Sequence, residues 1–87
     1  MAHTGSARKR IRQNVTRRER NRARKTRIKS EVRKLDTAVH AGQKDQAAAQ
    51  LKVTARVVDK IAATGTIHRN KAARLKSRLA RRVNKIK

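Results

Sequence analysis

The chain contains no Phe, Tyr, Trp, Cys or Pro, and glycine occurs only at Gly5, Gly42 and Gly65. Without aromatic side chains it lacks the stacking platforms of RRM, cold-shock and OB-type nucleic-acid-binding modules. Without cysteine, and with three widely spaced histidines, it lacks the ligand set of a zinc module. These absences exclude base-stacking and zinc-dependent modules, and we expect no metal and no cofactor.

Acidic residues and long apolar runs are also scarce. The five acidic residues are scattered, and there is no acidic pair in an apolar setting and no glycine-rich phosphate loop, so we expect no enzymatic activity. His68 is the one histidine in a basic and structured setting, which favours a helix-start or phosphate-contacting role over catalysis. No apolar run approaches the roughly 18 residues of a membrane span, so we expect a soluble, unprocessed chain with no membrane partner.

What the chain does contain is positive charge in two blocks. Its net charge is +22, with 12 of the 27 lysines and arginines in residues 1–30 and nine in residues 65–87. The segment between the blocks is nearly neutral. Charge this dense repels itself unless a polyanion lies against it, and binding of a polyanion releases counterions. The charge pattern therefore indicates a nucleic-acid partner.

The composition favours helix throughout, because Ala, Arg, Lys, Leu and Gln are good helix formers. We predict an all-α fold, a three-helix up-down-up antiparallel bundle with a long basic N-terminal helix extending beyond the core. Short connections near Gly42 and Gly65 place successive helices antiparallel. We expect a single helical domain over residues 1–87, in which residues 1–27 form the basic half of helix one and residues 28–87 form the bundle.

Capping signals set the expected limits of the helices. We expect helices at residues 6–40, 45–64 and 67–86. Ser6 and Asp45 stand where N-caps should be, and Gly65 is the expected left-handed stop after helix two.

Each helix carries an apolar stripe at the spacing of a packed helix face. The expected core residues are Ile28, Val32, Leu35 and Val39, then Ala48, Leu51, Ala55, Val57, Val58, Ile61 and Ala62, and finally Ala72, Leu75, Leu79, Val83 and Ile86. Between Thr16 and Arg27 the only apolar residue is Ala23, so no protein core can hold this part of helix one. We expect residues 1–27 to be frayed without a partner. The high net charge also keeps open the alternative that the whole chain is largely unfolded without its partner.

Three other interpretations of the basic helix stay open. A basic-zipper DNA binder is disfavoured because Arg17 and Arg18 replace the small residues that such helices set against base edges. In addition, the apolar stripe stops at Gly42 after fewer than two heptads. A membrane-active helix needs a bulky apolar face, which the segment before residue 28 lacks. A histone-like DNA compactor would bind duplex DNA about as well as RNA.

Arginine outnumbers lysine among the bases of the first 30 residues by nine to three. The planar guanidinium can bridge two phosphate oxygens or stack on an exposed base. A rod with cations on every side suits a place between converging backbones, which favours folded RNA over one straight duplex. We therefore interpret residues 1–27 as an RNA-inserting half-helix.

Two parts of the chain are similar to a known family. The stronger segment, residues 65–79, reads GTIHRNKAARLKSRL. The weaker set comprises residues 6–13, Arg17, Arg18, Asn21, Lys25, Thr26, Ala41, Gly42 and Asp45. Together they resemble the family of bacterial small-subunit ribosomal protein twenty, over essentially the whole chain. Arg69 stands where Lys is usual, which keeps the charge, and Thr66 replaces a more usual apolar residue.

The resemblance implies a structural constituent of the small ribosomal subunit in the bacterial cytoplasm, which binds directly to 16S-type ribosomal RNA and stabilises its folding during subunit assembly. It also implies a monomer within the ribosome, with other ribosomal proteins touching it only peripherally. Carried over to this chain, the expected rRNA-binding residues are Ser6, Arg8, Lys9, Arg10, Arg12, Arg17, Arg18, Arg20, Asn21, Arg22, Arg24, Lys25, Arg27, Lys29, His68, Arg69, Asn70, Lys71, Arg74, Lys76, Ser77, Arg78, Arg81 and Arg82.

Overall fold

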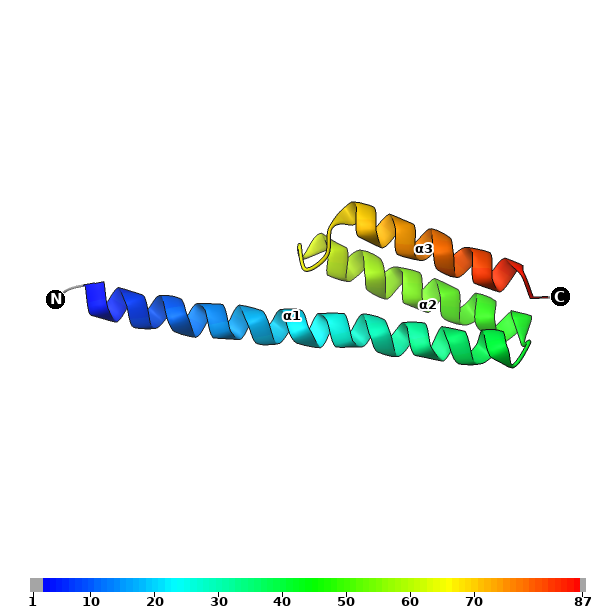
Figure 1. Cartoon of the computed structure of the whole chain (residues 1–87), viewed down its shortest axis with the longest axis horizontal. Helices are drawn as coiled ribbons and strands as arrows, with labels where there is room; N and C mark the ends of the chain where they lie inside the picture. The colour runs from blue at the N-terminus through cyan, green and yellow to red at the C-terminus, as the bar shows by residue number, and fades with distance from the viewer. Residues whose placement is uncertain (1–2, 87) are drawn as a thin grey trace.

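The computed structural model describes residues 3–86, and these form three α-helices and no strand (Figure 1). The helices are α1 (His3–His40), α2 (Lys44–Ala63) and α3 (Arg69–Asn84). Successive helices are antiparallel, and the second half of α1 packs with α2 and α3 while its first half projects alone. The prediction of an all-α bundle with an extended first helix is confirmed. Residues 1, 2 and 87 of the expected domain lie outside the described residues.

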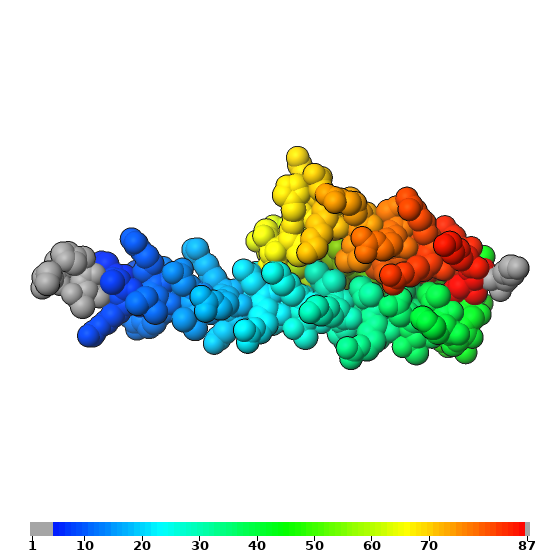
Figure 2. All heavy atoms as spheres, viewed as in Figure 1, coloured from blue at the N-terminus to red at the C-terminus, as the bar shows by residue number. Residues whose placement is uncertain are grey.

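The projecting half of α1 makes the molecule long. The Cα atoms extend over 67 × 21 × 13 Å with a radius of gyration of 17.7 Å, against about 12 Å for a compact chain of this length. At 1.5 Å per residue α1 is about 57 Å long and α2 about 30 Å, so α2 covers only about half of α1. We call residues 5–27 of α1 the rod. Figure 2 shows the rod leaving the bundle.

The rod is helical, although we expected it to fray without a partner. Two physical effects support helix here. Arginine and alanine have high intrinsic helix propensity, and extending a helix from a packed segment avoids the unfavourable nucleation step. The packed half of α1 therefore serves as the nucleus from which the rod continues.

Helix α1 ends at a left-handed glycine, Gly42, in the connection that was predicted there. Gly42 has a φ of +70°, a conformation in which a Cβ would be strained. The Gly42 N–H donates to the Val39 carbonyl at 3.0 Å, and the Gln43 N–H donates to the Ala38 carbonyl at 3.2 Å. This pair of bonds is a Schellman motif, and it satisfies two carbonyls that the helix end would leave free.

The two N-caps expected from the sequence are wrong. Helix α1 is already formed at His3, so Ser6 lies inside it. The N-cap of α2 is Gln43, which makes no side-chain capping bond, and Asp45 lies in the first turn. Because the first turn carries the positive end of the helix dipole, the Asp45 carboxylate is favourable there without capping the helix.

Helix α3 begins later than expected. Its N-cap is His68, whose Nδ1 accepts a hydrogen bond from the Asn70 N–H at 3.1 Å. The helix-start role expected of His68 is therefore confirmed. Ile67 lies in the connection and is buried, so it contributes to the core before the helix starts. The helix ends at Asn84, two residues short of the predicted limit.

The core consists of two apolar clusters to which all three helices contribute. The cluster near the α2–α3 connection contains Ile28, Val57, Val58, Ile61, Ile67 and Ala72. The cluster near the α1–α2 connection contains Leu35, Ala47, Leu79 and Val83. Val32 and Leu75 pack against both clusters and join them. The stripes predicted for α1 and α3 therefore close one continuous core.

The inward face of α2 is rotated relative to the predicted one. Ala47 and Thr54 are fully buried, whereas the predicted Ala48 is exposed and Ala55 is half-buried. The observed stripe runs through residues 47, 51, 54, 58 and 61, a helical spacing that contains one polar residue. Because Thr54 is polar, it does not match the apolar spacing expected of a core-facing stripe. The prediction therefore placed Ala48 and Ala55 in the core instead.

A polar cluster between α1 and α2 explains why a threonine is buried. Gln50 Nε2 donates to Glu31 Oε2 at 2.6 Å and to Thr54 Oγ1 at 3.1 Å. Thr54 Oγ1 donates in turn to the Glu31 carbonyl at 3.4 Å. Among the described residues, no buried side-chain nitrogen or oxygen lacks a hydrogen-bond partner. The cluster therefore fixes the register of α2 on α1 without leaving an unsatisfied polar group.

We expect Gln50→Ala to lower the free energy of unfolding by about 1–3 kcal/mol, because a mostly buried carboxylate would lose its amide donor. Urea denaturation followed by circular dichroism measures the change. The matched control is Gln46→Ala, an exposed glutamine one turn earlier, with an expected change within about 0.5 kcal/mol. Equal effects of the two substitutions would contradict a stabilising role of the cluster.

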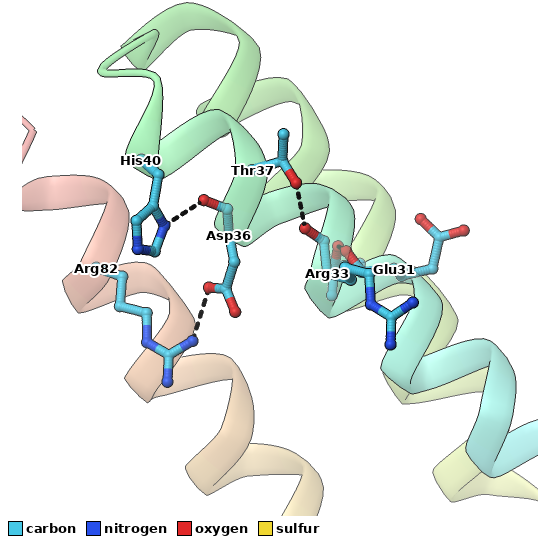
Figure 3. Close-up of polar contacts among 7 residues, drawn as sticks. Glu31, Arg33, Asp36, Thr37, His40 and Arg82 are labelled. Atoms are coloured by element: carbon cyan, nitrogen blue, oxygen red, sulfur yellow. Dashed lines mark hydrogen bonds and ion pairs between the residues drawn. The ribbon is translucent and has the colours of Figure 1, made fainter.

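An ion pair joins the C-terminal parts of α1 and α3. Arg82 Nη1 lies 2.8 Å from Asp36 Oδ1, and the two side chains are 43% and 38% exposed (Figure 3). Beside it the His40 Nδ1–H donates to the Asp36 carbonyl at 2.8 Å. An exposed pair of this kind contributes roughly 0–1 kcal/mol, so apolar packing holds α3 on α1 and the pair adds little.

Candidate nucleic-acid interface

The rod presents cations to solvent around its whole circumference. It holds eleven bases and one acid, Glu19. Because successive residues of a helix are about 100° apart, Arg12, Arg17 and Arg18 face three well-separated sides. The exposed residues of the predicted site on α1 are Ser6, Arg8, Lys9, Arg10, Arg12, Arg17, Arg18, Arg20, Asn21, Arg22, Lys25, Arg27 and Lys29. Only Arg24, among the rod side chains, is half-buried.

The outer face of α3 is a second basic surface. The exposed residues of the predicted site here are His68, Arg69, Asn70, Lys71, Arg74, Ser77, Arg78, Arg81 and Arg82. Arg74, Ser77, Arg78 and Arg81 follow one another at spacings of three and four, which places them on one helix face. They line an open groove of about 220 Å³. Three arginines therefore line one groove on α3.

Two residues of the predicted site are paired with acids of the protein itself. Lys76 Nζ lies 2.7 Å from Asp59 Oδ1, and Arg82 Nη1 lies 2.8 Å from Asp36 Oδ1. These pairs partly neutralise the two cations. Arg78 and Arg81 have no such partner among the ion pairs of the described residues. The structure therefore divides the cations of α3 into paired and available groups.

Sequence reasoning missed the contribution of the α2–α3 connection. Thr64, Gly65 and Thr66 lie beside the base of the rod, and the Thr66 hydroxyl is hydrogen-bonded to Arg24 and Asn21. The available signal was the pair of threonines flanking Gly65, since hydroxyl side chains can bond both backbone and arginine. The contact could not be inferred from the sequence, because Thr66 lies more than 40 residues along the chain from Arg24 and Asn21.

Both surfaces can bind anionic oxygens through guanidinium, ammonium, amide and hydroxyl donors. Within residues 3–86, no three His, Cys, Asp or Glu side chains gather as a metal site would require. No helix in that range combines the length and the apolar run needed to cross a membrane. A small helical core that carries two arginine-rich surfaces, one of them on an almost fully exposed rod, is typical of a structural protein that binds polyanions.

Comparison with known proteins identifies the family. Residues 2–84 match the family model of ribosomal protein S20. Small ribosomal subunit protein bS20 of Syntrophobacter fumaroxidans is 48% identical over 84 residues, which cover 97% of this chain and 98% of that protein. The bS20 protein of Corynebacterium jeikeium is 46% identical over 86 residues, 99% of each chain. The chain belongs to the ribosomal protein S20 family, a family of structural proteins rather than enzymes, which confirms the resemblance.

Proposed function

We propose that this protein is a structural constituent of the bacterial small ribosomal subunit that binds 16S-type ribosomal RNA directly and stabilises its folding during subunit assembly. The observation that carries the proposal is the rod, which has eleven bases and one acid and is exposed at every residue except Arg24. Like charges one turn apart destabilise a helix. RNA phosphates on several sides would remove that repulsion and release counterions.

In this proposal the two basic surfaces have different roles. The rod lies between converging RNA backbones, and the outer face of α3 contacts a further backbone. The apolar core sets the distance between the two surfaces, so the protein fixes RNA segments relative to one another. It acts as a monomer within the cytoplasmic ribosome, and neighbouring ribosomal proteins meet it only at the edges of the RNA contact.

Competition binding tests the proposal. The purified protein is titrated with small-subunit ribosomal RNA, duplex DNA and an unrelated folded RNA, at near-physiological salt because electrostatic affinity depends steeply on salt. We expect a clear preference for the ribosomal RNA. Equal binding to all three would mean that charge alone acts, and it would favour a nucleic-acid compactor.

The ion pairs on α3 predict unequal effects of two similar substitutions. We expect Arg78→Gln to weaken ribosomal RNA binding about three- to tenfold, because an available guanidinium is lost. We expect Arg82→Gln to weaken it by less than about twofold, because Asp36 already partly neutralises Arg82. Filter binding at one salt concentration compares the two variants. A larger loss for Arg82→Gln would contradict this division of the α3 cations.

A further inference from the structure

The rod leaves the bundle at an inner corner. Figures 1 and 2 show the first half of α1 running past the α2–α3 connection, which stands above it as a wall. The corner holds a cleft of about 350 Å³, and its lining residues are Arg17, Arg20, Asn21, Arg24, Thr64 and Gly65. The cleft thus has three arginines on one wall and a backbone turn on the other, and no acid lines it.

The three arginines face the cleft because of their spacing. Arg17, Arg20, Asn21 and Arg24 follow one another at intervals of three, one and three, so they form one stripe along the rod. Arg24 is the only rod side chain that the bundle partly buries. The turn therefore sits on this stripe and on no other face of the rod.

The α2–α3 turn holds two of these side chains in place. Thr66 Oγ1 accepts a hydrogen bond from Arg24 Nη1 at 3.4 Å and donates to Asn21 Oδ1 at 3.2 Å. It also lies 2.9 Å from Thr64 Oγ1, and Thr64 Oγ1 donates to the Ile61 carbonyl at 2.6 Å. This hydrogen-bond network connects the rod with the C-terminal end of α2. It orients Arg24 through one of its five N–H donors and leaves the others for a ligand.

The conformation of Gly65 completes the corner. Its φ of +81° reverses the chain after α2, and its N–H bonds the Ala62 carbonyl at 3.0 Å. A side chain at this position would be strained. The reversal places Thr64 and Thr66 on either side of a residue that has no side chain to fill the cleft.

We propose that the corner binds one phosphate group of an RNA backbone, an inference that rests on the proposed function and names one of its contact points. Arg17, Arg20 and Arg24 supply the charge, and a guanidinium matches the two free oxygens of a phosphodiester. The volume is near the lower limit of about 300 Å³ for ligand pockets, which suits a phosphate with part of its sugar. Thr66 is a positioning residue that acts through Arg24 and Asn21.

The test compares substitutions of equal charge inside and outside the corner in the full-length protein. Arg24→Gln is expected to weaken binding of small-subunit ribosomal RNA about tenfold, as for a well-placed charged hydrogen bond. The matched control is Arg22→Gln, since Arg22 is likewise a rod arginine but is exposed and lies about 160° around the helix from Arg24. The control should lose about threefold or less.

Substitutions of Thr66 separate positioning from charge. Thr66→Val keeps shape and charge, so we expect about a threefold loss of RNA affinity with an unchanged salt slope. Thr66→Ser restores the hydroxyl and should bind like the unaltered protein. Helical content and melting temperature by circular dichroism verify that each variant is folded. Binding by Thr66→Val equal to that of Thr66→Ser would overturn the positioning role.

Inorganic phosphate is the second probe. It tests whether the corner binds a free phosphate ion rather than a phosphate of the RNA backbone. We follow the Gly65 and Thr66 amide resonances during phosphate titration and compare them with the RNA affinities. Equal RNA affinities of Arg24→Gln and Arg22→Gln would overturn the RNA assignment, and saturable phosphate shifts would then define a free-phosphate site. Such a result leaves the proposed function intact, provided the unaltered protein still prefers ribosomal RNA. Loss of that preference in the unaltered protein would instead reject the proposed function itself.

Discussion

Replacing Leu79 by Asp is expected to abolish the cooperative unfolding transition of the protein. Leu79 is fully buried and belongs to the cluster that joins all three helices. A buried leucine truncated to alanine already costs about 2.7–5 kcal/mol, and a buried unpaired carboxylate costs more. Small domains have roughly 5 kcal/mol of stability or less to lose. Thermal melting followed by far-ultraviolet circular dichroism measures the result.

Two further substitutions make this result interpretable. Leu79→Ala should retain a transition at lower temperature, because it creates a cavity without burying charge. Val53→Asp should melt like the unaltered protein, since Val53 on the outer face of α2 is 46% exposed. If Leu79→Asp kept a two-state melt near the original temperature, the assigned core would be wrong.

The apolar stripes of α1 and α3 could be predicted from sequence because the residues that face the core there are uniformly apolar. Leu35, Leu79 and Val83 are all buried as expected. The stripe of α2 could not be placed as well. Its centre includes Thr54, and burial of a hydroxyl depends on partners that come from another helix. The spacing of apolar residues along the chain does not show whether another helix supplies such a hydrogen-bond partner.

The helix ends show the same division. Glycine at a helix end has a single backbone reason, the left-handed conformation. Both Gly42 and Gly65 lie in the predicted connections and adopt it, and the conformation itself was predicted for Gly65. N-caps depend on competition among several polar residues near the start of a helix. Helix α1 is already formed before Ser6, and in α2 the first turn begins before Asp45, so neither expected residue is an N-cap. Local residue type therefore predicts where a helix ends at a glycine better than it predicts where a helix begins.

The candidate site divides in a similar way. The two basic blocks could be assigned from charge alone, because no apolar stripe competes for the rod. The corner could not, because it depends on contacts between residues 42 and 45 positions apart in the chain. Pairing of Lys76 and Arg82 with acids was also invisible in the sequence. It reflects which faces of α1, α2 and α3 the core brings together.

Replacing Arg17, Arg18 and Arg20 together by Gln is expected to weaken ribosomal RNA binding about a hundredfold near 0.15 M salt. Each lost phosphate contact reduces the slope of log affinity against log salt by about 0.7–0.9, so three contacts reduce it by roughly two to three units. Affinity measured across a salt series gives both quantities. Arg17, Arg18 and Arg20 are all exposed and make no contact with the apolar core, and therefore the bundle should keep its melting temperature.

The control for this variant removes the same charge from another surface. Lys44, Lys52 and Lys60 are exposed on α2, in the nearly neutral segment of the chain. Replacing all three by Gln lowers the net charge by the same amount without touching either basic surface. If binding depends on phosphates held along the rod, this variant should keep most of the affinity and nearly the original slope. An equal loss in the two triple variants would show that total charge, and not the position of the rod arginines, determines binding.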